Sequence, residues 1–228
     1  MQQARYNIFN QIHKGLRAML YDTALLIQQT DFDNREDASA TIKQLETLLH
    51  YFDGHAEHED KFILPWIEKF DKKLVDDFEA EHVTDHALSK NLFEYIADWK
   101  AADDEQKLVD LGRLIFYEFN LFVAFNLNHM NKEEQLLNQV LWEHYTDAEI
   151  LGMEHAIISS IPQDVLLDES RWMMRSINNA EATAWLAGIR NNAPAPVFDV
   201  YMAMAEEEMT LPRFTQVKAG LSEGVMVI

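Results

Sequence analysis

The chain has 228 residues, and its 39 acidic side chains against 19 basic ones give a formal net charge of −20. This charge disfavours nucleic acid and anionic membrane surfaces as partners, because both are polyanionic. The absence of Cys excludes disulfides, thiolate catalysis and Cys-ligated zinc, while 48% hydrophobic residues and few Gly and Pro disfavour a turn-rich all-β fold.

The first two thirds of the chain have the apolar periodicity of four long helices. Polar breaks that contain helix-capping residues separate them, so the predicted helices cover residues 4–30, 38–70, 74–101 and 107–145. Pro65 removes a backbone donor and crowds the carbonyl of Lys61, which predicts a kink or an early end of the second helix.

Past residue 146 the chain changes character. Shorter helices are predicted over residues 150–161, 162–178, 180–190 and 197–209, with a linker over residues 191–196. Six of the ten Met lie between residues 153 and 209, and ordinary core filling explains them better than the alternative, a homodimer or partner surface. The fold class is therefore all-α: an up-down-up-down four-helix bundle over residues 1–146 with a helical extension over residues 147–228.

His and Glu interrupt the apolar stripes of all four long helices. Leu48, Phe52, Phe62 and Trp66 share one face of the second helix with His55 and Glu59, which stand one turn apart. Buried charge is costly unless it is paired or bound to metal, so these side chains require partners. The other helices also have polar residues at positions of their apolar stripes: His13 on the first, His82 and His86 on the third, and His129 and Glu133 on the fourth.

The distances of these side chains from the turns indicate whether they meet. In an up-and-down bundle, residues equidistant from a turn lie at the same level. The midpoint of His13 and His55 is position 34, inside the first break, and that of Glu59 and His82 is 70.5, inside the second. The midpoint of His86 and His129 is 107.5, just past the third break. Since each helical residue rises about 1.5 Å, the seven side chains are predicted to share one level of one core.

Five His and two Glu exceed the four ligands of a tetrahedral zinc ion. They suit two ions of octahedral preference, with Glu59 and Glu133 as candidate bridges, and imidazole-rich sites with one or two carboxylates suit iron among the redox metals. The zinc metalloprotease motif is absent, because no second His follows His58-Glu59 at the required spacing.

These motifs resemble the hemerythrin family, in particular its bacterial HHE cation-binding branch. The resemblance covers about residues 4–145 and rests on the ligand spacings, on Glu59…Pro65 and on the run His129-Met-Asn-Lys-Glu-Glu134. It implies a non-haem di-iron cofactor, two Fe ions bridged by Glu59, Glu133 and an oxo or hydroxo group, with an open position where dioxygen binds as peroxide. By the family pattern one iron is held by His82, His86 and His129, and the other by His13 and His55.

The sequence departs from hemerythrins proper at one position. Those proteins have an Asp five residues after the last His, whereas Glu133 follows His129 after four and Glu134 after five. Either glutamate is a candidate for the second bridge.

Three functions remain open on these residues. The first is binding of dioxygen or a related diatomic or peroxide, for carriage, storage or sensing; neutral imidazoles favour it because they stabilise high-valent iron less than carboxylates do. The second is an enzyme that reduces peroxide or nitric oxide or oxidises iron, and the third is an iron or redox sensor that signals through the carboxyl-terminal helices.

A soluble, cytoplasmic protein is expected, because no apolar leader and no run of 18 apolar residues occurs.

Overall fold

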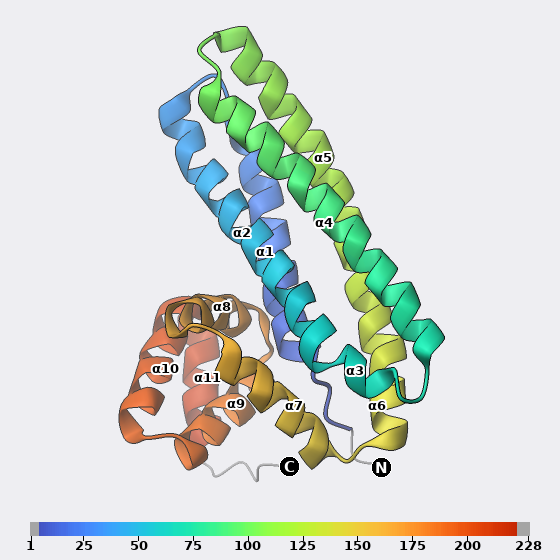
Figure 1. Cartoon of the computed structure of the whole chain (residues 1–228). Coiled ribbons are helices and arrows are strands. Elements are labelled where there is room, and N and C mark those ends of the chain that lie inside the picture. The colour runs from blue at the N-terminus through green and yellow to red at the C-terminus, as the bar shows by residue number, and fades with distance from the viewer. Residues whose placement is uncertain (1–4, 223–228) are drawn as a thin grey trace. The chain divides into compact units, whose positions relative to one another are not determined.

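The computed structural model describes residues 5–222, and every regular element within that range is a helix (Figure 1). The all-α fold class is thereby confirmed. The elements are α1 (Asn10–Gln29), α2 (Arg35–Phe62), α3 (Leu64–Ile67), α4 (Lys72–Ala101), α5 (Glu105–Lys132), the π-helix η1 (Glu133–Leu137), α6 (Asn138–His144), α7 (Asp147–Ser160), α8 (Gln163–Ser176), α9 (Asn179–Asn192), α10 (Ala195–Glu208) and α11 (Leu211–Ser222).

The three polar breaks supply the residues that start the long helices. The Asn34 side chain accepts hydrogen bonds from the backbone N–H groups of Glu36 and Asp37 at the start of α2. Asp71 and Asp104 cap α4 and α5 in the same way. A capping side chain satisfies backbone donors that have no partner inside the helix, which explains why the breaks lie where the sequence predicts them.

Two helix ends differ from the simple pattern of four long helices. α1 begins at Asn10, although the apolar pattern extends back to residue 4, which lies outside the described residues. α2 ends at Phe62, and the short helix α3 follows with Pro65 in its first turn. Proline is tolerated there because the first-turn N–H groups have no acceptor within the helix. The predicted early end near Pro65 is confirmed.

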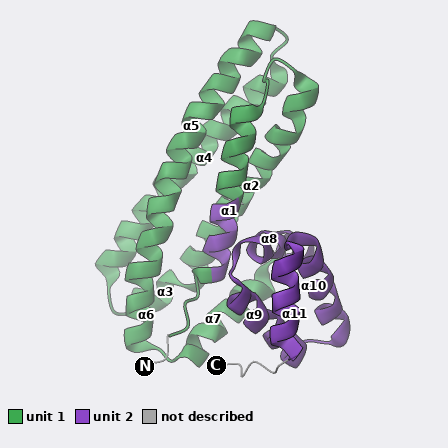
Figure 2. Cartoon of the chain, turned by 180° about the vertical axis from the view of Figure 1, so that it is seen from behind, with its two compact units in different colours: residues 1–10, 19–161 green, residues 11–18, 162–228 purple. Residues whose placement is uncertain are grey.

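Among the described residues, the first of two compact units contains residues 5–10 and 19–161 (Figure 2). Within it α4 packs against both α2 and α5, and these helices run side by side and alternate in direction (Figure 1). Fully buried aliphatic side chains fill the interior between them, including Leu20, Leu48, Leu92 and Ile115. This unit has the up-and-down arrangement that the spacing of the polar side chains requires.

Helix α7 belongs to this first unit, whereas the sequence places the start of the extension at residue 147. Ile150 and Met153 are buried in one cluster with Leu137 and Leu141. The apolar side of α7 therefore packs on the end of the bundle, which a boundary drawn from composition does not reveal.

The second compact unit contains residues 11–18 of α1 and, as far as the structure describes the chain, residues 162–222. Its described helices α8–α11 enclose a core that includes Met174, Met204 and Met209, so these methionines fill a core as expected. The α1 segment is part of the packing: Lys14 Nζ lies 2.5 Å from Glu181 Oε1, and Gly15 closely approaches Met173.

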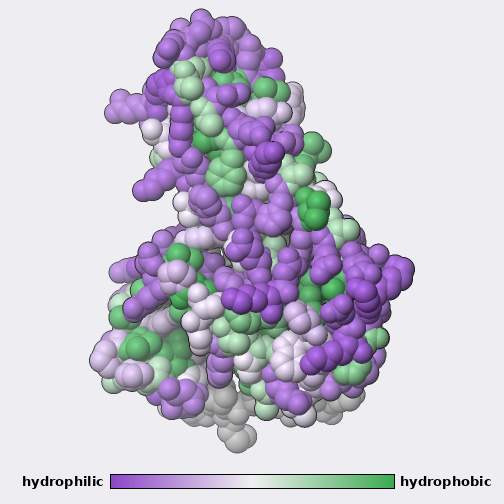
Figure 3. All heavy atoms as spheres, in the orientation of Figure 1, coloured by the Kyte–Doolittle hydropathy of each residue, from purple (hydrophilic) through white to green (hydrophobic). Residues whose placement is uncertain are grey.

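Hydrophilic residues cover most of the face of the molecule drawn in Figure 3. Among residues 5–222, no helix has both the length and the apolar character that a membrane span requires.

Candidate metal centre

Six of the seven predicted ligands come together in the core. Within residues 5–222, two overlapping groups of His and Glu offer ligand atoms that lie within 4.8 Å of one another. We call the group of His13, His55, Glu59 and Glu133 the first position. The group of Glu59, His82, His129 and Glu133 is the second position. Both carboxylates belong to both groups.

The two shared carboxylates are separated from water. Glu59 is 2% exposed and Glu133 is fully buried. Removing ionised carboxylates from water is costly unless cations or hydrogen-bond donors compensate them. The surrounding imidazoles are the available compensation, and a bound cation would supply more.

The distances place ring nitrogens toward these carboxylates. His55 Nε2 lies 3.1 Å from Glu59 Oε1, and His129 Nε2 lies 2.8 Å from Glu133 Oε1. His82 Nε2 lies 3.4 Å from Glu59 Oε2 and 3.7 Å from Glu133 Oε1. This His82 nitrogen is buried and makes no hydrogen bond, which is the environment of an atom placed to coordinate a cation.

A π-helix begins at one of the shared ligands. Helix α5 ends at Lys132, and η1 runs from Glu133 to Leu137 before α-helical geometry resumes. A π segment widens the helix by one residue, and such interruptions are frequent at functional sites. Glu133 is fully buried and shared by both positions, whereas Glu134 is only partly buried and belongs to neither. Of the two candidate bridges, Glu133 is therefore the one in the cluster.

His86 is the predicted ligand that the structure does not bring into either described group. Its side chain is 44% exposed, and its Nδ1 lies 3.0 Å from Asp53 Oδ1. It lines a shallow pocket of about 370 Å³ with Ser89 and Phe93. The buried stripe of α4 runs through His82, Asp85, Ser89, Leu92 and Ile96, so Asp85 and not His86 follows His82 on the inner side.

The buried carboxylates raise the proton affinity of the second position's imidazoles. Burial alone would lower the pKa of His82, but the adjacent carboxylates of Glu133 and Glu59 outweigh this effect and raise the pKa to about 11. Burial also opposes protonation of His129, and its interactions with Glu133 and Glu81 raise the pKa to about 9. Without a metal both rings are therefore in the cationic imidazolium form at neutral pH, and a metal ion must displace one proton from each ring.

The donor set fits divalent metal ions. Four imidazoles and two carboxylates converge in a buried space, and within the described residues no second cluster of this kind occurs. Imidazole and carboxylate are ligands for iron, zinc, manganese and related ions. The two groups share the carboxylates of Glu59 and Glu133.

The sequence profile of the hemerythrin HHE cation binding domain matches residues 5–141. This range is more than half of the chain and contains every member of both positions. The chain belongs to the hemerythrin HHE cation-binding family. The resemblance inferred from the ligand spacings is thereby confirmed.

One curated relative extends the likeness beyond the hemerythrin HHE domain. A zinc finger protein BRUTUS-like of Arabidopsis thaliana is 25% identical over 187 residues, which cover 80% of this chain. The aligned part is only 14% of that protein's length, so the chain corresponds to a small portion of it. No solved structure matches the chain significantly.

Several polar side chains around the HHE site are not evident from the sequence pattern. Asp60 and Glu81 contact the ring nitrogens of His82 and His129 that face away from the cluster. Asp85 is 3% exposed and accepts a hydrogen bond of 2.6 Å from Asn126 Nδ2, and burial raises the pKa of its carboxyl group. The sequence feature that could have predicted the inward position of Asp85 is its spacing of three residues from His82, which places both on one side of a helix.

Two aromatic rings pack against the His129 imidazole. The ring centroid of Phe78 lies 5.6 Å from that of His129, and the ring of Phe125 stacks on it at 5.7 Å. These ring contacts restrict how the His129 imidazole turns.

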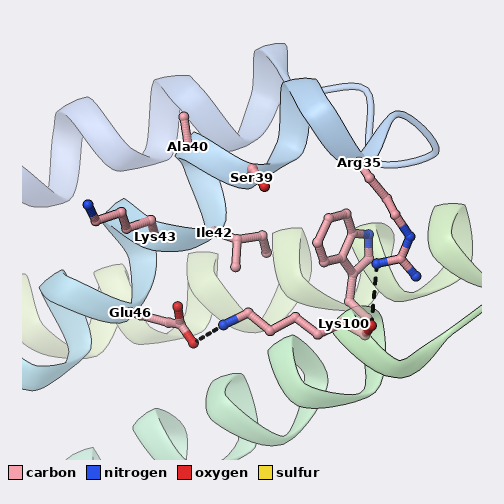
Figure 4. A pocket seen from close by; sticks show the side chains of 8 residues that line it. Arg35, Ser39, Ala40, Ile42, Lys43, Glu46 and Lys100 are labelled. Atoms are coloured by element: carbon pink, nitrogen blue, oxygen red, sulfur yellow. Dashed lines mark hydrogen bonds and ion pairs between the residues drawn. The ribbon is translucent and has the colours of Figure 1, made fainter.

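A separate hollow of about 560 Å³ lies between α2 and the end of α4, and its walls include Ser39, Ile42 and Lys43 (Figure 4). Lys100 Nζ contacts Glu46 Oε1 at 2.5 Å, and Arg35 donates to the backbone oxygens of Lys100 and Ala102. These two cations are thus engaged by the protein itself, and the hollow contains no member of either metal position.

Proposed function

We propose that this protein is a non-haem di-iron protein that binds dioxygen or a related small ligand for carriage, storage or sensing. The observation that carries the proposal is the sharing of Glu59 and Glu133 by the two positions. A carboxylate has two oxygens and can therefore bridge two cations. The predicted ligands His13, His55, His82 and His129 would complete the pair.

The ligand count leaves room for a small molecule. Each position offers four protein ligands, and a metal ion with octahedral preference takes six. A buried site with unfilled coordination positions suits a small ligand that needs no large pocket. Iron would supply reversible electron transfer to dioxygen, and the donor set of imidazoles and carboxylates, in a chain without Cys, is compatible with iron.

The chain's own residues would hold the ions and exclude water. Glu59 and Glu133 would neutralise part of the cationic charge, and the four imidazoles would add ligands without adding charge. The rings of Phe78 and Phe125 pack around His129, which would limit side reactions with solvent.

Metal analysis combined with an optical titration tests the proposal. Iron per chain is counted, the protein is reduced without oxygen, and oxygen is then admitted and removed. We expect about two irons per chain and a visible absorption band that appears and disappears reversibly. Irreversible oxidation would favour the enzyme reading, and a protein that binds no metal would overturn the proposal.

An iron sensor is the second candidate, and the packing of the His13 segment favours it. Residues 11–18 of α1 form a compact unit with the carboxyl-terminal helices, through Lys14–Glu181 and the approach of Gly15 to Met173. A ligand carried by this segment would link metal occupancy to the stability of those helices. Limited proteolysis with and without a chelator tests this: metal-dependent protection of residues 162–222 would support it, and identical cleavage in both states would oppose it.

A further inference from the structure

Two carboxylates outside the metal positions contact the far side of the second position's imidazoles. His82 Nδ1 lies 2.6 Å from Asp60 Oδ1, and His129 Nδ1 lies 2.8 Å from Glu81 Oε2. An ionised carboxylate accepts hydrogen bonds and cannot donate them, so each ring must donate its Nδ1–H. In the neutral form of the ring, the form that binds a metal, the hydrogen on Nδ1 leaves the lone pair on Nε2, the nitrogen that faces Glu59 and Glu133.

The contacts join three helices in series. Asp60 follows the ligand Glu59 on α2 and reaches His82 on α4, while Glu81 precedes His82 on α4 and reaches His129 on α5. Each carboxylate is thus a chain neighbour of one ligand and the hydrogen-bond partner of another. A displacement of either helix would move both a ligand and the partner that orients the next one.

Glu81 is itself fixed by a third side chain. Lys132 Nζ donates to Glu81 Oε1 at 2.6 Å, while Glu81 Oε2 accepts from His129. Both oxygens therefore have partners, and the side chain of Glu81 is only 26% exposed. A carboxylate held at both oxygens restrains the imidazole more strongly than one that rotates in solvent.

We propose that Asp60 and Glu81 are positioning residues of the second position, which set the tautomer and orientation of His82 and His129 and thereby its metal affinity. The inference rests on the proposed metal binding. Neither carboxylate would touch the ion. Partners of this kind raise the basicity of the ligand nitrogen, and their loss typically weakens metal affinity about 10–100-fold.

Cobalt(II) binding to the full chain tests the proposal without any assay of activity. The variants are Glu81→Ala, Glu81→Gln and Asp60→Asn, and the matched controls are Glu79→Gln on α4 and Glu57→Gln on α2, both exposed. Titration against a competing chelator gives the affinities of the two ions. We expect Glu81→Ala to weaken one of them about 10–100-fold, with Glu81→Gln intermediate because an amide oxygen still accepts the hydrogen bond.

A second readout separates positioning from a general loss of structure. In the cobalt-loaded protein, the Nδ1–H protons of coordinated imidazoles give paramagnetically shifted NMR signals that exchange with solvent. We expect Glu81→Ala to accelerate the exchange of one signal, assigned to His129 by its proximity to Phe125, and Asp60→Asn to affect another. The melting temperatures of the metal-free variants identify any loss of folding.

The outcomes distinguish this inference from the proposed function. If the wild type binds cobalt but the Glu81 and Asp60 variants match their controls in affinity and exchange, the positioning role is wrong and the metal site stands. If neither the wild type nor the controls bind cobalt, the proposed function fails and the positioning role fails with it.

Discussion

His129 and Glu133 stand one helical turn apart, and His129 Nε2 lies 2.8 Å from Glu133 Oε1 at the point where α5 becomes a π-helix. Two helical geometries thus meet at a candidate metal ligand. The π segment begins with Glu133, which turns fully into the core while Glu134 stays at its margin.

Replacing these two glutamates should therefore have unequal effects. Glu133→Ala removes a carboxylate that belongs to both positions, so iron per chain should fall from about two to below one. Glu134→Ala leaves both positions intact and should keep the wild-type iron content. Iron analysis of the purified variants, with circular dichroism as a check on folding, measures the difference. Equal losses in the two variants would contradict the assignment of Glu133 as the shared ligand.

A second comparison concerns the two histidines of α4. His82 is buried in the second position, whereas His86 is held at the surface by Asp53. We expect His82→Ala to lose about one ion per chain and His86→Ala to keep the iron of the wild type. Loss of one ion in His86→Ala would show that this ring moves inward when metal binds and acts as the fifth imidazole predicted from the sequence.

A third comparison uses the histidines of the last long helical segment. His144 stacks on Phe70 with ring centroids 3.7 Å apart and belongs to neither position in the described structure. His129→Ala should lose at least one ion, and His144→Ala should lose none while slightly reducing stability through the lost stacking contact. Iron content and thermal melting of both variants check this. Metal loss in His144→Ala would contradict the site described above.

The stability of the metal-free protein should depend on pH because of His82 and His129. Their pKa values are raised to about 11 and about 9 from 6.5 by the buried carboxylates, against the opposing effect of burial. A group whose pKa is higher in the folded state stabilises the fold fully below its unfolded pKa, and loses this contribution as pH rises through its folded pKa. The free energy of unfolding of the metal-free chain should therefore decline between about pH 6.5 and about pH 11.

Urea denaturation of the metal-free and metal-loaded chain across this range measures the effect. In the loaded protein the coordinated imidazoles are already deprotonated, so these two groups should contribute no such decline. Metal binding at neutral pH should also release protons, which a weakly buffered titration detects. A pH-independent stability of the metal-free chain, or metal uptake without proton release, would contradict the raised pKa values.

Two helical glycines provide a paired test of packing. A Cβ at Gly112 would overlap the side chain of Phe32, whereas a Cβ at Gly54 would meet nothing within 4 Å. Gly112→Ala should destabilise the fold by about 1–3 kcal/mol through overpacking. Gly54→Ala should stabilise it by up to about 1 kcal/mol because Ala has the higher helix propensity. Chemical denaturation of both variants measures these changes, and the opposite signs would contradict the packing around Phe32.

The sequence alone determined the helical class, the four long helices and the polar breaks between them, because these depend on contacts within a few residues. The capping residues Asn34, Asp71 and Asp104 lie in these breaks. The sequence also identified six side chains that the structure brings together, since His and Glu on an apolar stripe are visible without a fold. Their equal distances from the turns place them at one level, because antiparallel helices of equal rise leave little freedom along the bundle axis.

Only the tertiary structure decided which side chains face the core where a small rotation of the helix would exchange two neighbours. It also decided which side chains are paired with residues far away in the chain. Asp85 and His86 are both near the inner face of α4, and only the packing of α2 and α5 turns the first inward and the second outward. The π-helix selects Glu133 over Glu134 by a local change that no residue type announces. Asp60 and Glu81 resemble solvated acids in the sequence, because their imidazole partners lie on other helices and come within hydrogen-bond distance only when the bundle closes.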